Sequence, residues 1–316
     1  MAAIEVRDLH KNYGDNRAVD GVDFHVDDGE VYALLGHNGA GKSTVVEILE
    51  GHRSATSGSV SVLGFDPASG TREFRDRIGV VLQESGIEDE FTVREVIDLY
   101  ASAYRSRRTL DEVIDLTGLH DKVDERVGSL SGGQQRRLDL GLGIVGRPDL
   151  LFLDEPTTGF DPSARRKSWD LIEALGAEGV TVLLTTHYLD EAEHLANRVG
   201  VLGAGKMIAE GTPADLIAGV SGTVVSFMLP QSVAVSDALA TFGQVLDVDV
   251  RLSGRLIEAT VDRATEVVHR ATGWALDHDV ELESLSVKRA SLEDVFLQLT
   301  EQSNALAEQS DGEEQR

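Results

Sequence analysis

The residues best suited to chemistry form a glycine-rich stretch at 36–43, Gly-His-Asn-Gly-Ala-Gly-Lys-Ser. An apolar run of strand length precedes it at 31–35, and residues 43–50 carry apolar side chains at helical spacing. In such a strand–loop–helix unit the loop N–H groups converge on a phosphate, and the glycines leave room for it. The lysine reaches the β- and γ-phosphates, the serine binds Mg²⁺, and the helix N-terminus adds its dipole. A plain glycine turn beside an exposed lysine is the alternative for the pattern alone, but the order of strand, loop and helix argues against it.

We therefore predict a site for ATP and Mg²⁺ in this loop, with Ser43 as a metal ligand. The predicted nucleotide-binding residues of the loop are Gly36, His37, Asn38, Gly39, Ala40, Gly41, Lys42, Ser43 and Thr44.

Two acidic residues follow a second apolar run, 150–153, which has the continuous pattern of a strand buried on both faces. Asp154 and Glu155 should lie at the carboxyl edge of a parallel sheet, where open α/β folds bind ligands. Asp154 is predicted to hold Mg²⁺ and Glu155 to polarise the attacking water. The strand material at 180–186 ends in His187, which we expect to point at the γ-phosphate. An ordinary acidic strand end is the alternative for the carboxylates taken alone.

A second glycine turn, Ser131-Gly132-Gly133, leads into a helical stretch that runs from Gln134 to Val145 and has a basic first turn. The free N–H groups at such a helix start make a second anion site.

These motifs, in this order, resemble the nucleotide-binding subunit of ATP-binding-cassette (ABC) transporters over roughly residues 4–215. The resemblance adds an aromatic residue at Tyr13, a glutamine at Gln83 and the turn Gly159-Phe160-Asp161, where leucine is usual in place of Phe160. It implies that Tyr13 stacks on adenine and that Gln83 senses Mg²⁺ and the attacking water.

The resemblance also implies that ATP lies between two chains. Asp161 would contact the opposite subunit, and the signature residues Ser131, Gly132, Gly133 and Gln134 would hold the partner's γ-phosphate. We therefore expect a homodimer or a heterodimer with a homologous subunit, closed by ATP and opened by hydrolysis.

Length and composition indicate the number of domains and the cellular location. The chain has 316 residues and no cysteine, which allows two domains and fits a reducing compartment. No apolar segment approaches the roughly 20 residues that span a bilayer, and the first residues lack a signal-peptide pattern. We expect a cytoplasmic protein, peripheral on the inner face of the cell membrane through a separate permease subunit.

The charge is strongly acidic, with 29 basic against 55 acidic residues and a net charge of −26. Such a surface repels nucleic acid, so no nucleic-acid partner is expected. Adaptation to high internal salt is the favoured explanation, and an acidic variant from a GC-rich genome is the alternative.

The expected fold class is α/β: a P-loop NTPase core with a RecA-like mixed sheet flanked by helices, antiparallel β and helical ABC subdomains, and a small α+β C-terminal domain. Residues 4–28 read as short alternating strands with a turn at 13–16. Residues 1–218 form the predicted ATP-binding domain, with a helical subdomain at about 84–146. Within that subdomain, the resemblance makes Phe91 a candidate contact for the membrane subunit.

Beyond residue 219 the pattern β-α-β-β-α-β predicts a ferredoxin-like accessory domain at 222–302. Its strands are expected at 224–229, 245–250, 256–261 and 280–287, and its helices near 232–242 and 264–277. A closing helix at 291–300, capped by Ser291 with Asp294, resembles the end of drug-resistance-type ABC-2 exporter ATPases. An acidic tail, 303–316, is expected to be disordered.

The predicted function is the ATP-hydrolysing subunit of an ABC transporter, and the resemblance of this C-terminal segment favours an exporter. A soluble ABC ATPase acting on ribosomes or DNA is one alternative. A regulatory or structural nucleotide-binding module, in which Glu155 and His187 are dispensable, is the other.

Overall fold

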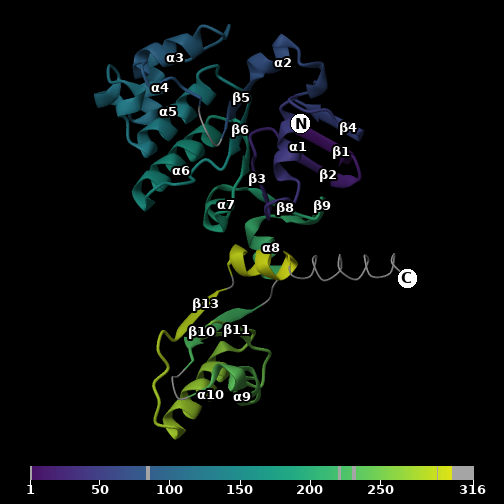
Figure 1. Ribbon diagram of the computed structural model, residues 1–316, viewed down its shortest axis with the longest axis vertical. Coiled ribbons are helices and arrows are strands. Elements are labelled where there is room, and N and C mark those ends of the chain that lie inside the picture. The colour runs from purple at the N-terminus through teal and green to yellow at the C-terminus, as the bar shows by residue number, and fades with distance from the viewer. Residues whose placement is uncertain (1, 83–85, 220–221, 230–232, 290, 301–316) are drawn as a thin grey trace. The chain divides into compact units, whose positions relative to one another are not determined.

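The computed structural model describes residues 2–82, 86–219, 222–229, 233–289 and 291–300 (Figure 1). It divides into two compact units, the first built mainly from Met1–Pro213 and the second from Ala214–Gln298. Gln83 and the expected tail 303–316 lie outside the described residues.

A six-stranded sheet with strand order β5-β6-β7-β3-β8-β9 forms the centre of the first unit. All neighbouring strands are parallel except the last pair, β8 and β9. The strands are β3 (Val31–Gly36), β5 (Ile78–Val81), β6 (Leu150–Asp154), β7 (Thr181–Thr185), β8 (Arg198–Gly203) and β9 (Lys206–Gly211). The three strands expected from the apolar runs 31–35, 150–153 and 180–186 are confirmed to within one residue at each end, and β3 and β7 are buried along their whole length.

A separate antiparallel sheet has the order β2-β1-β4, formed by β1 (Ala2–Tyr13), β2 (Asn16–Asp27) and β4 (Ser57–Val62). Tyr13 pairs with Asn16 across the expected turn. The expectation of short strands over residues 4–28, on both sides of this turn, was wrong, because β1 and β2 have twelve residues each. Register shifts such as the one between Val6 and Leu9 interrupt the alternation, so one bulged strand reads like several short ones.

The helices that accompany these sheets are α1 (Lys42–Leu49), α2 (Arg72–Arg77), α6 (Pro162–Ala177) and α7 (Leu189–Leu195). The next helix, α8 (Pro213–Gly219), lies at the boundary of the two units, and residues 214–219 belong to the second. Short 3₁₀ turns lie at Pro67–Ser69, His120–Lys122 and Val127–Ser129.

A helical subdomain is formed by α3 (Val93–Ala101), α4 (Leu110–Thr117) and α5 (Gly132–Ile144). Figure 1 shows these helices together on the side of β5 and β6 away from the β1–β2–β4 sheet. The three helices share a core of their own. Its fully buried members include Val93, Ile97, Val113, Leu138 and Val145. The helices α3 and α4 each begin with a capping box.

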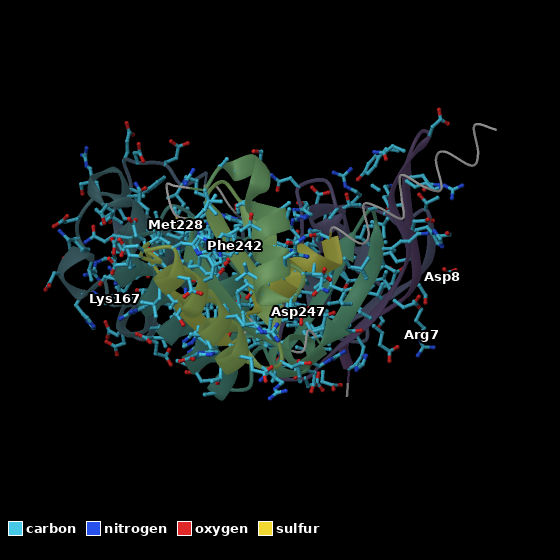
Figure 2. The ribbon with its side chains drawn as sticks, turned by 90° about the horizontal axis from the view of Figure 1, so that it is seen from below. Arg7, Asp8, Lys167, Met228, Phe242 and Asp247 are labelled. Atoms are coloured by element: carbon cyan, nitrogen blue, oxygen red, sulfur yellow. The ribbon has the colours of Figure 1, made fainter. Side chains whose placement is uncertain are left out.

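The second unit holds a four-stranded antiparallel sheet of order β11-β12-β10-β13. Its elements are β10 (Thr223–Met228), a 3₁₀ turn (Val235–Asp237), α9 (Ala238–Leu246), β11 (Arg251–Ser253), β12 (Leu256–Val261), α10 (Ala264–Asp277) and β13 (Ser286–Arg289). This order along the chain and across the sheet is the ferredoxin-like arrangement. Phe242, labelled in Figure 2, anchors the core, with its ring centroid 5.1 Å from that of Phe227 and 4.9 Å from that of Trp274.

Three expected elements of this unit lie elsewhere in the structure. Residues 245 and 246 end α9 instead of opening a strand, because Leu246 packs in the core at helical spacing from Phe242. The strand itself is the short β11. The last strand covers only Ser286–Arg289 of the segment expected at 280–287, with a shift toward the C-terminus. The first helix likewise begins six residues later than expected.

Residues 292–300 are helical, as expected for the closing segment. The Ser291 N–H donates to Asp294 Oδ2 at 2.7 Å and the Asp294 N–H donates to Ser291 Oγ at 3.4 Å, which completes the predicted cap. Across the described part of the chain, no helix is both long enough and apolar enough to cross a bilayer.

Candidate nucleotide-binding site

The glycine-rich loop joins the carboxyl end of β3 to the start of α1. Gly41 adopts φ +104°, and a Cβ at this position would lie 2.5 Å from the carbonyl oxygen of Ala18. No side chain caps the N-terminus of α1. The loop therefore needs glycine where it turns and leaves the first N–H groups of α1 available to an anion.

Lys42 is folded back along this loop. Its Nζ donates to the carbonyl oxygens of Gly36 at 2.7 Å and His37 at 3.2 Å. Burial lowers the pKa of the Lys42 ammonium, while the nearby charges of Glu155 and Asp154 act in the opposite direction. A cation is thus held between the loop and the two acidic residues, where the phosphates of a nucleotide carry their charge.

The acidic pair lies beside this loop because β3, β7 and β6 are adjacent parallel strands. Asp154 accepts a hydrogen bond from the Thr185 hydroxyl on β7. Glu155 adopts φ +48°, a left-handed conformation, and its N–H donates to Thr185 O at 3.0 Å. This turn carries the carboxylate of Glu155 off the strand and over the edge of the sheet.

Contacts with Thr158 and His187 orient the Glu155 carboxylate. Thr158 Oγ1 donates to Glu155 Oε2 at 3.0 Å, and His187 Nδ1 lies 3.2 Å from Glu155 Oε1. The carboxylate is oriented by both contacts, and it can accept a proton from water while the imidazole faces the same space. The structure thus brings together the residues expected for hydrolysis, except Gln83, which lies outside the described part.

The residues present fit ATP and Mg²⁺. No side chain caps the N-terminus of α1, and Ser43, the second residue of this helix, is exposed. Ser43 and Asp154 offer hard oxygen ligands of the kind that Mg²⁺ takes together with substrate phosphates.

The second glycine turn forms a pocket of its own, of about 390 Å³. It is lined by the signature residues Ser131–Gln134, by Gly159–Asp161, and by the cations Arg137 and Lys167. Lys167 lies on α6 and is labelled in Figure 2. None of the loop residues 36–44 lines this pocket. In Figure 1 the helices α1 and α5, which begin at the two turns, lie on opposite sides of β6.

The signature helix begins at Gly132, two residues earlier than expected, because Ser131 serves as its N-cap. Gln134 Oε1 accepts from the Ser131 N–H at 2.8 Å, and Ser131 Oγ accepts from the Gln134 N–H at 3.4 Å. Asp161 similarly caps α6, accepting from the N–H groups of Ser163 and Ala164.

Tyr13 lies at the end of β1 with 40% of its surface exposed. Lys11 Nζ and Arg53 Cζ each lie 5.3 Å from the centroid of its ring. The ring is accessible and has cationic neighbours, which suits contact with a nucleotide, and its stacking on adenine stays a prediction.

Several supporting residues were missed by the sequence reasoning. Thr185 donates a hydrogen bond to Asp154, and Thr158 donates one to Glu155. Nothing in the sequence distinguishes these two threonines from other hydroxyl residues near the acidic pair. Glu191 is fully buried, and its Oε1 accepts from Thr157 Oγ1 at 2.8 Å and Trp169 Nε1 at 3.0 Å. Arg136 had been read only as part of a basic first turn, although it is buried.

Comparisons with known proteins agree with this site. The family model described as ABC transporter matches residues 19–158, which include the phosphate loop, the signature and the acidic pair. A second model, for the C-terminal domain of ABC transporter domain-containing proteins, matches residues 223–291 in the second unit.

Similar curated proteins cover both units. Nod factor export ATP-binding protein I of Burkholderia pseudomallei strain 1710b is 40% identical over 306 residues, which cover 95% of this chain and 97% of that protein. Daunorubicin resistance ATP-binding protein DrrA3 of Streptomyces coeruleorubidus is 37% identical over 303 residues, covering 94% and 96%.

Solved structures match the first unit's fold. One is an ATP-binding subunit of an ABC transporter, with a TM-score of 0.63 and 29% identity, covering 69% of this chain and 92% of that chain. Another is a dimeric structure of a bacterial ABC transporter cassette, with a TM-score of 0.58 and 25% identity, covering 66% and 98%. The chain therefore belongs to the ATP-binding proteins of ABC transporters, and its activity is the hydrolysis of ATP.

Proposed function

We propose that this chain is the energy-converting subunit of an ABC exporter and that it works with a separate membrane permease. Relatives that match it over about 95% of its length, the accessory unit included, are named for Nod factor export and daunorubicin resistance. These names support export as the direction of transport. The strongly acidic surface and the export relatives leave the ribosome or DNA alternative without support.

Within the site, Glu155 acts as the general base that takes the proton of the attacking water. His187, 3.2 Å away, orients this carboxylate and faces the γ-phosphate. Ser43 and Asp154 hold Mg²⁺, and Lys42 binds the phosphates. When bound, Mg²⁺ neutralises the negative charge that develops on the transferring phosphoryl group.

The working form is a dimer, either of two copies or of this chain with a homologous subunit. The observation that carries this proposal is the separation of the two glycine turns: the signature residues line a pocket that contains no residue of the phosphate loop. The exposed Ser131 and Gly132 are available to a partner's nucleotide. A head-to-tail pair would complete two sites, each with the loop of one chain and the signature of the other.

The test uses Glu155→Gln, which should bind ATP without hydrolysing it. Gel filtration with light scattering should give a monomer in ADP and a dimer in ATP·Mg²⁺. The control Glu155→Gln/Lys42→Ala, which lacks the phosphate-binding ammonium, should stay monomeric in both. A Glu155→Gln chain that binds ATP and yet remains monomeric would contradict the proposed dimer.

The helical subdomain offers the contact for the permease. Leu82, Phe91, Leu99 and Tyr100 are large apolar residues of which 40–55% of the surface is exposed. Binding there would place this chain at the cytoplasmic face of the membrane. Co-purification with a polytopic membrane protein, lost in Phe91→Ser and retained in an exposed α10 variant such as Leu276→Ser, tests this assignment.

A further inference from the structure

Arg136 lies on the signature helix α5, two residues after Gln134, and its guanidinium donates hydrogen bonds to several backbone carbonyls. Its Nη2 donates to Asp154 O at 2.8 Å and to Glu155 O at 3.1 Å. Its Nε donates to Pro156 O at 3.1 Å, and its Nη1 donates to Leu82 O. One guanidinium therefore joins α5 to the ends of two adjacent strands, β5 and β6.

This arginine is buried, with 6% of its surface exposed. A buried charge is costly unless its hydrogen bonds are satisfied. Burial lowers the pKa of the Arg136 guanidinium, and the nearby charges of Asp139, Asp154 and Glu155 act in the opposite direction. The Asp139 carboxylate on the same helix lies 3.8 Å from Nη1. Because the guanidinium of Arg136 is buried, breaking its hydrogen bonds to the backbone carbonyls would be costly.

The carbonyl groups that Arg136 binds flank the one left-handed turn of the acidic segment. Glu155, at φ +48°, is neither glycine nor asparagine, so this conformation needs support from its surroundings. Two contacts to this turn come from β7, where Thr185 O accepts from the Glu155 N–H and the Thr185 hydroxyl donates to Asp154. The contacts from the opposite side come from Arg136.

We propose that Arg136 is a positioning residue for hydrolysis: it holds the turn that aims the Glu155 carboxylate and ties this turn to the signature helix. It acts through the backbone of residues 154–156, so a shift of α5 is carried directly to the base. The inference rests on the proposed role of Glu155.

The chemistry of the side chain favours this role. Arginine presents five N–H donors in a rigid planar fork, which can serve several carbonyl groups at once. Lysine has the charge but not the fork, and glutamine has neither the charge nor the reach. The three side chains should therefore rank in the order Arg, Lys, Gln in the turnover that they allow.

The experiment measures steady-state ATP hydrolysis of the full chain carrying Arg136→Gln or Arg136→Lys. Since a misplacement of about 1 Å can cost roughly a hundredfold in rate, Arg136→Gln should lower kcat about tenfold to hundredfold, and Arg136→Lys less. Binding of ATP·Mg²⁺, measured by calorimetry in the Glu155→Gln background, should change by less than about threefold when Arg136→Gln is added. The control is Arg108→Gln, which removes another arginine with 8% exposure, bound to Glu178 away from this turn.

The outcomes of these measurements support or overturn the proposed role of Arg136. A kcat that is unchanged, or that falls only as far as ATP affinity falls, overturns the proposal, as does an equal kcat loss in Arg108→Gln. Should Arg136→Gln fail to fold by circular dichroism, Arg136→Lys carries the same comparison of kcat with affinity. In Glu155→Gln the residual turnover should not fall further when Arg136→Gln is added, because the base is already absent. A Glu155→Gln chain with wild-type turnover would instead refute the proposed function of Glu155.

Discussion

The helices α1 and α5 both begin at glycine turns that suit an anion, but their first turns are satisfied differently. The start of α1 has Gly41 at φ +104° and no capping side chain. The start of α5 has a complete capping box between Ser131 and Gln134. The N-terminus of α1 therefore has no side-chain cap and lies in the chain's own phosphate loop. The N-terminus of α5 is capped by its own side chains, and Ser131 and Gly132 are exposed.

The difference matches what each end must do. No side chain caps the N–H groups at the start of α1, so a bound anion can complete that helix end. The signature helix keeps its form without a ligand. Its Ser131 Oγ accepts at 3.4 Å, a long hydrogen bond that is easily exchanged for one to a phosphate. We infer that the phosphate loop needs the bound nucleotide to complete its helix end. The signature helix is already capped and can exchange its cap for the phosphate of a nucleotide bound by a second chain.

The largest expected effect lies on the loop side. Glu155→Gln should lower kcat by about 10²–10⁴-fold, the usual contribution of a general base, with ATP affinity nearly unchanged. Phosphate release at saturating ATP·Mg²⁺ measures the first quantity, and calorimetry measures the second. Glu173→Gln, an exposed carboxylate on α6, is the control and should keep wild-type turnover. Equal losses in the two variants would remove Glu155 from the chemistry.

The comparison sharpens with one alanine at each helix start. Gly41→Ala forces a left-handed residue, which costs about 1–2 kcal/mol, and places Cβ 2.5 Å from Ala18 O. It should lower both stability and ATP affinity, the latter by more than about tenfold because the cradle is displaced. Gly132→Ala meets no atom within 4 Å and lies in the first turn of α5. Its stability should be unchanged or rise by up to about 1 kcal/mol.

The two alanines should also separate binding from assembly. Gly132→Ala should bind ATP normally as a monomer, yet lose the ATP-dependent dimer, since the added methyl group faces the signature pocket. Urea unfolding, calorimetry and gel filtration measure the three properties. A Gly132→Ala chain with weakened monomer binding would show that the two turns serve one site within a chain.

The loop, the acidic pair and His187 could be predicted from sequence because each depends on local chemistry. A phosphate loop needs its glycines in a fixed order, and a buried parallel strand reads as an unbroken apolar run. The spatial meeting of these motifs followed from their shared position at the carboxyl ends of strands. The signature turn was predicted as an anion site for the same local reason, through its helix start.

The contacts between distant segments could not be predicted. Arg136 follows another polar residue on a helix, and only the packing of α5 against β5 and β6 buries it. The segment after Phe242 failed for a related reason: Val245 and Leu246 fit a strand or a buried helix end equally well, and tertiary packing selects the helix. Strand length in the β1–β2 hairpin was hidden by bulges.

The stability of the chain should depend on pH through Glu50, which ends the helix that begins at the phosphate loop. Glu50, just after α1, is buried, and burial together with the charges of Asp154 and Glu47 raises its pKa from 4.5 to about 7. Between these pH values the folded chain binds more protons than the unfolded chain, so the free energy of unfolding contributed by Glu50 falls as pH rises. It levels off above about pH 7, with a total change of at most about 3 kcal/mol.

Glu50→Gln should therefore be more stable than wild type at pH 8 and equal to it near pH 4.5. Urea unfolding at several pH values measures this, with the exposed Glu88→Gln as control. Glu112 on α4 provides the opposite case in the helical subdomain. Hydrogen bonds from Thr109 and Arg147 lower its pKa to about 2, so its stabilisation is present above pH 4.5 and is lost as pH falls through about 2. A Glu50→Gln advantage that grew toward acidic pH would contradict the assigned burial.

The smallest expected effect tests the signature side directly. Ser131→Ala removes the N-cap of α5 and should lower the free energy of unfolding by about 1 kcal/mol. Thr109→Ala removes the equivalent cap of α4, which has the same capping box but does not line the signature pocket. The two variants should therefore lose similar stability in urea. Only Ser131→Ala should also lose turnover at saturating ATP, because its hydroxyl is offered to the phosphate of a second chain. Equal turnover in the two variants would mean that Ser131 only caps its helix. The proposed difference between the starts of α1 and α5 would then be supported only by the Gly41→Ala and Gly132→Ala variants.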